Sequence, residues 1–312
     1  MQRRCGVGVL LSLLAMGLGS VASAEPLHVV ATTTLVGDVV RSIAGALVRL
    51  DVLFPVGADP HAFQPTPRDA VAVAGAEIVF ISGGGLEASI ADLLANAAGS
   101  VVDLFEELHA VGLVLDGAET DEDGAHDHDH DGADPHVWLD PNLVAIWVDA
   151  IEAALAERDP ANATAYAAAA SEYRAALAEL DVWIRDRVDV LPPERRRLVT
   201  DHMAFGYFAA RYGFEQVGSV FPGFSTLAEP SAREMADLVE TIRSLDVSAI
   251  FVGAAVNPTL AEAIALDAGA VVVRLYTGSL SDAAGPAADY FSLIRYDVEA
   301  IVEALSTRGE QE

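Results

Sequence analysis

The chain has 312 residues, 52% of them apolar, which is enough for two domains of ordinary size. Its formal charge is -29, and all 18 basic residues are arginine, so we expect no binding to nucleic acid or anionic lipid. The single cysteine, Cys5, excludes a disulfide framework and a thiolate metal site. The acidity would attract cations, but only weakly, because salt screens exposed charge.

The first 24 residues have the pattern of a secretory signal peptide. A basic start precedes an apolar run from Val7 to Val21, and Ala22-Ser23-Ala24 is a small-residue cleavage site. A membrane anchor would need about 18 or more apolar residues, and this run is shorter. Cys5 lies before the run, so it cannot be the lipidated cysteine of a lipoprotein. We therefore expect residues 1–24 to be cleaved and the remainder to be exported.

Residues 25–158 alternate between short apolar runs and helical patterns. Because the crossovers between the runs are ten or more residues long, the pattern predicts a parallel sheet covered by helices on both faces. Thr66-Pro67-Arg68-Asp69 is a typical helix start, with a cap residue, a proline and an acid in the first turn. The predicted strands are 27–33, 48–54, 77–82 and 101–104, and the predicted helices are 36–46, a helix from 66, and 86–97.

An acidic segment interrupts this first lobe at residues 119–132. It alternates acids with His126, His128 and His130 and contains almost no apolar residue, so it cannot form a packed core. Two interpretations remain open: weak capture of divalent metal by the three histidines, or a solvated linker.

A long helix is predicted between the lobes, within residues 159–193. Asp159-Pro160 is a helix start, and apolar residues recur every three or four positions until Pro192-Pro193. About 32 residues at 1.5 Å each give a rod of roughly 48 Å. The helix either packs on one lobe or acts as a rigid strut that joins both. A rod without internal glycine or proline would resist wide hinge closure.

Residues 194–312 repeat the alternation of strand and helix, so the chain is predicted to form two similar α/β lobes. Ser231-Ala232-Arg233-Glu234 is a capping box. The predicted strands are 198–200, 249–252 and 271–276, and the predicted helices are 203–212, 231–245, 257–267 and 290–305.

Three histidines stand in related local settings: Asp59-Pro60-His61, Asp134-Pro135-His136 and Asp201-His202. Proline restricts the backbone on both sides, so the first two imidazoles are presented from rigid turns. Three neutral imidazoles on separate loops are typical of a zinc or similar transition-metal site. The neighbouring aspartates either hold an imidazole N–H or stabilise the turns.

These motifs resemble those of the solute-binding proteins of zinc and manganese ABC importers. The resemblance covers nearly all of the chain after residue 24, and the Asp-Pro-His-x-Trp-x-Asp-Pro stretch is its most specific part. The matching segments are 57–61, 65–67, 134–141, 200–202, 229–233 and 256–258.

The resemblance implies two α/β lobes joined by one long helix, with metal bound in the cleft between them. It implies that His61, His136 and His202 are ligands, and that histidine rather than carboxylate at position 202 is typical of zinc-type members. The implied function is high-affinity capture of Zn2+ in the periplasm and delivery to the membrane permease of an ABC importer. A periplasmic metallochaperone is a further candidate partner, and we expect a monomer.

One position departs from the family pattern. Many members carry an aspartate ligand where this chain has Gly278, within Thr277-Gly278-Ser279-Leu280. Either Asp282 replaces that ligand after a shift of the loop, or water fills the fourth position.

Two alternatives remain beside the zinc assignment. The first is a manganese- or iron-binding member of the same class. The second is a zinc-dependent hydrolase, which would need a general base and a substrate pocket. The sequence contains no His-Glu-x-x-His motif, no Gly-x-Ser-x-Gly motif and no glycine-rich phosphate loop, so we expect no enzyme.

Overall fold

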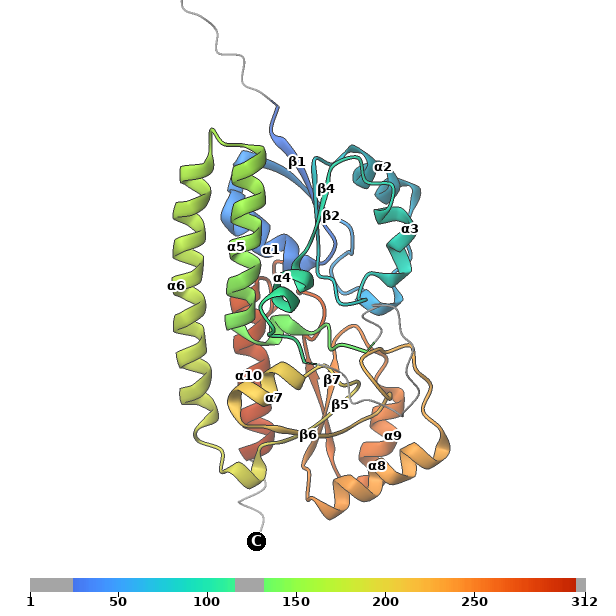
Figure 1. Ribbon diagram of the computed structural model, residues 1–312. Coiled ribbons are helices and arrows are strands. Elements are labelled where there is room, and N and C mark those ends of the chain that lie inside the picture. The colour runs from blue at the N-terminus through green and yellow to red at the C-terminus, as the bar shows by residue number, and fades with distance from the viewer. Residues whose placement is uncertain (1–24, 116–131, 307–312) are drawn as a thin grey trace, which may run out of the picture.

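The computed structural model describes residues 25–115 and 132–306 and shows two lobes, each built on a four-stranded parallel sheet (Figure 1). The strand orders, β2-β1-β3-β4 and β6-β5-β7-β8, are equivalent, so the two lobes share one topology. The predicted fold class is confirmed. The strands are β1 Leu27–Ala31, β2 Val48–Val52, β3 Ile78–Ile81, β4 Ser100–Asp103, β5 Arg197–Thr200, β6 Glu215–Ser219, β7 Ala249–Gly253 and β8 Val271–Leu275.

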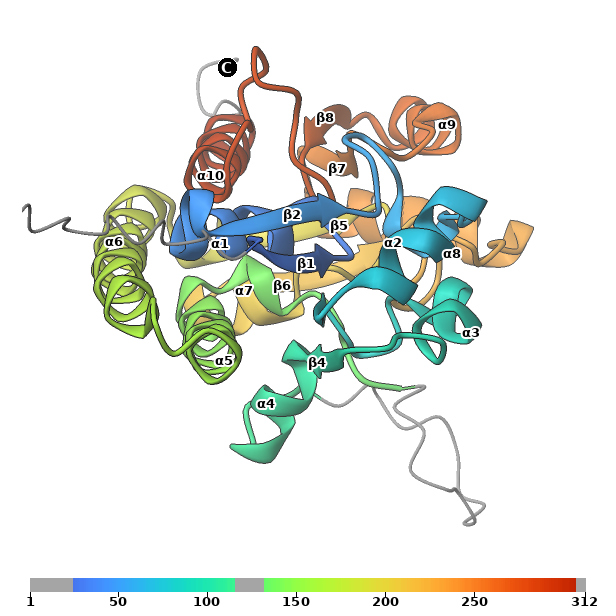
Figure 2. The same cartoon turned by 90° about the horizontal axis from the view of Figure 1, so that it is seen from above.

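Helices cover both faces of the first sheet. Figure 2 shows α1 on the side of α5 and α6, and α2 and α3 on the opposite side. The capping box predicted at Thr66 is present, with Pro67 in the first turn and Asp69 bonded back to the Thr66 backbone. The helices of this lobe are α1 Thr34–Ala44, α2 Pro67–Gly75, α3 Ala91–Leu94, α4 Leu104–Ala110 and α5 Pro141–Arg158.

The predicted helix at 86–97 is wrong. The segment forms only a 3-10 turn, η3 (Ala88–Ile90), and the single turn of α3. The reason is the buried Glu87, whose carboxylate accepts hydrogen bonds from the Thr32 hydroxyl and from the Ser82 and Gly83 backbone. Burial raises the pKa of Glu87 to about 7. This residue thus closes the loop after β3 and immediately precedes the short helical segment 88–94.

The linking helix is shorter than predicted. Two helices, α5 and α6 (Ala163–Val188), meet at a turn in place of a rod that begins at Pro160. The Asp159 carboxylate closes this turn by accepting bonds from the Asn162 side chain and the Tyr166 hydroxyl. The 26 residues of α6 span about 39 Å rather than 48 Å.

Helix α6 runs alongside both lobes in Figure 1, and it packs against α1 from the first and against α7 and α10 from the second. The largest apolar cluster of the described residues continues across it, from Val39 on α1 through Leu180 on α6 to Leu293 on α10. The lobes therefore share one core along the linking helix, and each has a separate core on its outer side.

In the second lobe the sequence-based prediction missed β6, which is a half-exposed edge strand without an apolar run. The capping box of Ser231 and Glu234 is present as predicted. The helices are α7 Gly206–Tyr212, α8 Ala232–Ser244, α9 Thr259–Ala268 and α10 Tyr290–Ser306.

Residues 276–289, here called the strap, follow β8 but lie on the first lobe. The Ser279 hydroxyl accepts a hydrogen bond from the Gly57 N–H at 2.8 Å, and the Leu280 N–H donates to the Thr34 hydroxyl at 2.9 Å. Just after the strap, the Tyr290 N–H donates to Asp38 on α1 at 3.0 Å. The strap thus joins the lobes independently of α6.

Two predictions fall outside the described residues. They are the signal peptide at 1–24 and, apart from Gly132, the acidic segment 119–132 with its three histidines. Within the parts of the chain that the structure describes, no helix is long and apolar enough to cross a membrane.

Candidate metal centre

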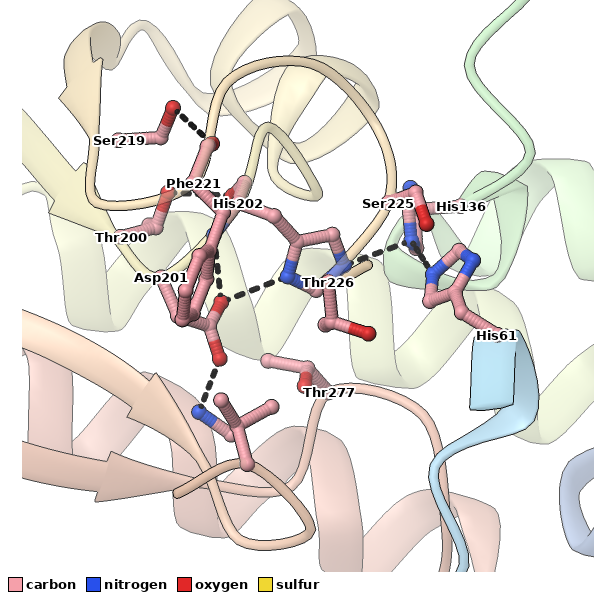
Figure 3. A network of polar contacts seen from close by, with 12 residues as sticks. His61, His136, Thr200, Asp201, His202, Ser219, Phe221, Ser225, Thr226 and Thr277 are labelled. Carbon is pink, nitrogen blue, oxygen red and sulfur yellow. Dashed lines mark hydrogen bonds and ion pairs between the residues drawn. The ribbon is translucent and has the colours of Figure 1, made fainter. Parts of the chain in front are cut away.

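The three histidines meet between the lobes, and their Nε2 atoms converge on one point (Figure 3). The Nε2 atom of His136 lies 3.0 Å from that of His202 and 3.3 Å from that of His61. His136 and His202 are 1% and 3% exposed, whereas His61 is half-buried. The structure therefore brings together the three histidine side chains that the sequence analysis had grouped.

His61 is presented by the 3-10 turn η2 (Pro60–Ala62) after β2. Asp59 caps this turn, and its Oδ1 atom accepts the backbone N–H of His61 at 3.0 Å. The other oxygen, Oδ2, accepts the hydroxyl of Thr226 from the second lobe at 2.6 Å. Asp59 thus stabilises the turn and does not hold the imidazole of His61.

Both the backbone and the ring of His136 contact one carboxylate, unlike those of His61. The Oδ1 atom of the buried Asp134 accepts the backbone N–H of His136 at 2.9 Å and lies 2.8 Å from its Nδ1 atom. When Nδ1–H donates to this carboxylate, the lone pair of Nε2 faces the cluster. Trp138, in the following turn, packs against the His136 ring and donates to the Thr277 carbonyl. Asp140 then caps α5.

His202 follows β5, the strand at which the order of the second sheet reverses, and such switch points are common ligand sites. The Oδ1 atom of Asp201 lies 2.7 Å from Nδ1 of His202 and also accepts its backbone N–H. The second oxygen accepts the Gly253 N–H at the end of β7. A Cβ atom on Gly253 would lie 2.4 Å from the Thr277 hydroxyl, so glycine is needed there.

Burial and proximity favour the neutral form of two of the imidazoles, those of His61 and His136. Burial, and then the neighbouring His202, lower the pKa of His61 to about 4 and the pKa of His136 well below its usual value. Burial also raises the pKa of Asp134 to about 8. Neutral imidazoles with free Nε2 lone pairs are the form that binds a metal ion.

Asp282, one of the two alternatives for the fourth ligand position, does not lie in this cluster. It is exposed, and its carboxylate accepts the Ala284 N–H within a turn of the strap. The strap approaches the site at Gly278, where an added Cβ atom would lie 3.0 Å from the Pro60 ring. That close packing turns the following residues away from the histidines. The wall opposite the cluster is formed by Thr226, Ala255, Val256, Thr277 and Gly278.

The enclosed cavity measures about 10 Å³, close to the smallest space that holds one water molecule. In a tetrahedral zinc site with Zn–N bonds of 2.0–2.1 Å, the nitrogen atoms lie about 3.3–3.4 Å apart. Two of the observed distances, 3.0 and 3.3 Å, are close to this spacing, and all three ligand atoms lie within 4.8 Å of one another. Three nitrogen donors would leave one position open, with room for a small ligand and not for an organic substrate.

Sequence reasoning missed two features of the site, Thr226 and Gly253. Thr226 lies in an irregular loop without any local pattern, and nothing in the sequence indicates its bond to Asp59. Gly253 could have been noticed only as a glycine at the end of an apolar strand, which often marks a close approach of the backbone.

Two lobes of like topology around a buried histidine cluster define the class of metal-binding solute-binding proteins. Residues 29–304 match the family model described as "ZnuA: Zinc-uptake complex component A periplasmic", and the chain belongs to this family. It is therefore the extracytoplasmic metal-binding component of an ABC importer, with permease and ATPase partners, and not an enzyme.

The named relatives differ in their metal. The chain is 31% identical to "Manganese-binding lipoprotein MntA" of Halalkalibacterium halodurans, over 96% of each chain. It is 32% identical to "Zinc-binding protein TroA" of Treponema pallidum, over 91% of this chain and 90% of the relative. The solved structure of the periplasmic zinc-binding protein TroA superposes with a TM-score of 0.80 at 29% identity, covering 90% and 99% of the two chains.

Proposed function

We propose that this protein captures Zn2+ through His61, His136 and His202 and delivers it to the importer. The observation that carries the proposal is the donor set: within the described residues the cluster holds three imidazole nitrogens and no carboxylate. Nitrogen donors favour zinc over manganese, which prefers oxygen ligands. The relatives are named for manganese, zinc and iron, so similarity to them does not select one metal. The proposal of zinc therefore rests on the side chains of this chain.

A competition titration tests the proposal. The protein without residues 1–24 is stripped of metal and titrated with zinc, manganese and iron against a chelator. We expect one tight equivalent of zinc and clearly weaker binding of manganese, because imidazole nitrogens suit zinc better than manganese. Equal affinity for the two ions would support the manganese assignment instead.

Two variants make this titration specific. His202→Glu replaces one nitrogen donor by a carboxylate and should move the preference toward manganese. Asp282→Ala removes a carboxylate that the structure places outside the cluster, so zinc affinity should not change. A loss of zinc binding in Asp282→Ala would contradict the three-histidine site.

The acidic segment is proposed as a second, weaker site. Deleting 119–132, with His126, His128 and His130, should remove only weak zinc equivalents and leave the tight site intact. A periplasmic metallochaperone remains a candidate partner for this segment. We also propose that the protein acts as a monomer, which sedimentation of the zinc-loaded form would test.

Several relatives are named lipoproteins, whereas Cys5 precedes the apolar run in this chain. We therefore expect export without a lipid anchor. The intact mass of the exported protein tests this, since cleavage after Ala24 without lipid gives one defined value.

A further inference from the structure

The loop of residues 221–231, between β6 and α8, lies over the histidine cluster. Its start is tied to the segment that carries His202: the Phe221 N–H donates to the Asp201 carbonyl at 2.7 Å, and the Met203 N–H donates to the Gly223 carbonyl at 2.9 Å. Its end is fixed by the capping box at Ser231. The middle of the loop places Thr226 beside His202 (Figure 3).

One hydrogen bond joins this loop to the first lobe. The Thr226 hydroxyl donates to Oδ2 of Asp59 at 2.6 Å, and no other bond from the loop to that lobe occurs among the described residues. Oδ1 of the same carboxylate holds the backbone of His61. Asp59 therefore couples the position of one histidine directly to the position of the loop.

Two of the other walls of the cavity are held by more bonds or by deeper burial. On one side the strap is fixed by the Ser279 and Leu280 bonds to the first lobe. On another side Trp138 is buried and bonded to the Thr277 carbonyl. The loop, in contrast, carries Leu227 with 63% of its surface exposed, and it covers the half-buried His61. The wall between Thr226 and Asp59 is therefore closed by one partly buried hydrogen bond, whereas the strap and Trp138 are held more firmly.

We infer that Asp59 and Thr226 form a latch that sets how fast the metal ion enters and leaves the site. Neither residue is a ligand; both are positioning residues that keep the 221–231 loop closed over His61. Opening this latch exposes His61 while His136 and His202 keep their aspartate partners. The inference rests on the proposed function for its cargo, but the latch does not depend on which divalent ion is bound.

The test uses Thr226→Val, which keeps the shape of the side chain and removes the hydroxyl. Association is measured by mixing the metal-stripped protein with zinc, and dissociation by mixing the loaded protein with excess chelator in a stopped-flow instrument. Loss of a hydrogen bond to a carboxylate should speed both steps by about tenfold and change the equilibrium affinity by less than about threefold.

Two matched variants control for other effects. Thr226→Ser keeps the hydroxyl and should restore rates close to those of the original protein. Ser225→Ala removes a neighbouring hydroxyl whose bond among the described residues, to the Leu227 N–H, lies within the loop, so both rates should stay unchanged. An unchanged circular dichroism spectrum of each variant shows that the fold is intact.

The outcomes are distinct. Equal rates in Thr226→Val and the original protein would overturn the latch. Faster dissociation with unchanged association, and a proportional loss of affinity, would also overturn it, because Thr226 would then stabilise the bound state only. If the original protein does not bind zinc tightly, the proposed cargo is wrong, and the same rates measured with manganese still test the latch.

Discussion

Two segments of the second lobe reach across to the first, and they are held very differently. The strap is fixed by buried polar groups, with Ser279 and Leu280 bonded to Gly57 and Thr34. The 221–231 loop mixes half-buried and exposed residues, and among the described residues its single hydrogen bond to the first lobe is the one from Thr226 to Asp59. One of the two strap bonds is buried, whereas the single bond of the loop is partly buried. We therefore expect the strap to set the distance between the lobes and the loop to move more easily.

The largest effect is expected at the site that both segments enclose. His136→Ala removes the most buried of the three nitrogen donors. Structural zinc sites contribute about 10–16 kcal/mol in total, so losing one of three ligands should weaken zinc binding by a factor on the order of a thousand or more. Isothermal titration with a competing chelator measures this. Tight binding retained in His136→Ala would place the metal elsewhere.

A second large effect, on the free energy of unfolding, is expected at Asp181 on α6. Its carboxylate accepts bonds from Arg211 and Tyr212 of the second lobe and from Asn142 at the start of α5. Burial alone would raise the pKa of Asp181, but the hydrogen bonds from Arg211, Tyr212 and Arg185 together lower the pKa to about 2. This residue is a third connection between the lobes, distinct from the strap and the loop.

The lowered pKa predicts a pH dependence with a defined sign. The folded value of about 2 lies below the unfolded value of about 3.9, so Asp181 stabilises the fold above pH 4 by about 2 kcal/mol, and this is lost as the pH falls toward 2. Asp181→Asn should therefore lower the free energy of unfolding at neutral pH, and the difference should shrink below pH 4. Denaturant unfolding at several pH values measures it. A difference independent of pH would exclude the charge as the cause.

A smaller effect on stability is expected when one hydroxyl is removed from the strap and another from the loop, and comparing these two variants tests whether the two segments differ. Ser279→Ala leaves the Gly57 N–H without its acceptor and should lower the free energy of unfolding by about 1–2 kcal/mol. In a protein of this size that corresponds to a melting temperature lower by roughly 2–8 °C. Ser225→Ala in the loop should change it by less than about 0.5 kcal/mol. Equal losses in the two variants would remove the distinction between strap and loop.

The smallest expected change is in overall shape. Because α6, the strap and Asp181 all join the lobes, the radius of gyration should stay the same within about 1 Å when zinc binds, on the scale of local changes in preorganised proteins. Hydrogen exchange should slow in the 221–231 loop and around His61, with the strap and α6 unaffected. A change of several ångströms with altered exchange along α6 would indicate hinge closure instead.

Sequence patterns predicted much of the fold because many strands and helix starts of the two lobes are determined by neighbouring residues. Apolar runs such as Leu27–Ala31 and Ala249–Gly253 are buried central strands, and the capping boxes at Thr66 and Ser231 start helices where expected. The failures have local causes as well. Glu87 turns inward to bond the loop after β3, and Asp159 closes a turn that shortens the linking helix.

The candidate site was predictable for a different reason. Each histidine stands beside an aspartate, and in two cases a proline fixes the turn, so the presentation of His61, His136 and His202 is encoded within a few residues. The position of Asp282 could not be predicted from sequence distance alone: Gly278 packs on Pro60, and Asp282 lies exposed in a later turn of the strap. The hydrogen bond between Thr226 and Asp59 joins residues far apart in the sequence, so no local sequence pattern predicts it.

The sequence by itself determined the alternation of strands and helices, the turns that present the histidines and the nitrogen character of the donor set, because each of these depends on neighbouring residues. The tertiary structure alone decided which atoms meet: three Nε2 atoms at one point, a strap bonded to the opposite lobe, and one hydroxyl closing the site. These contacts depend on how two lobes pack along α6, and packing between distant segments is set by shape and burial over the whole molecule.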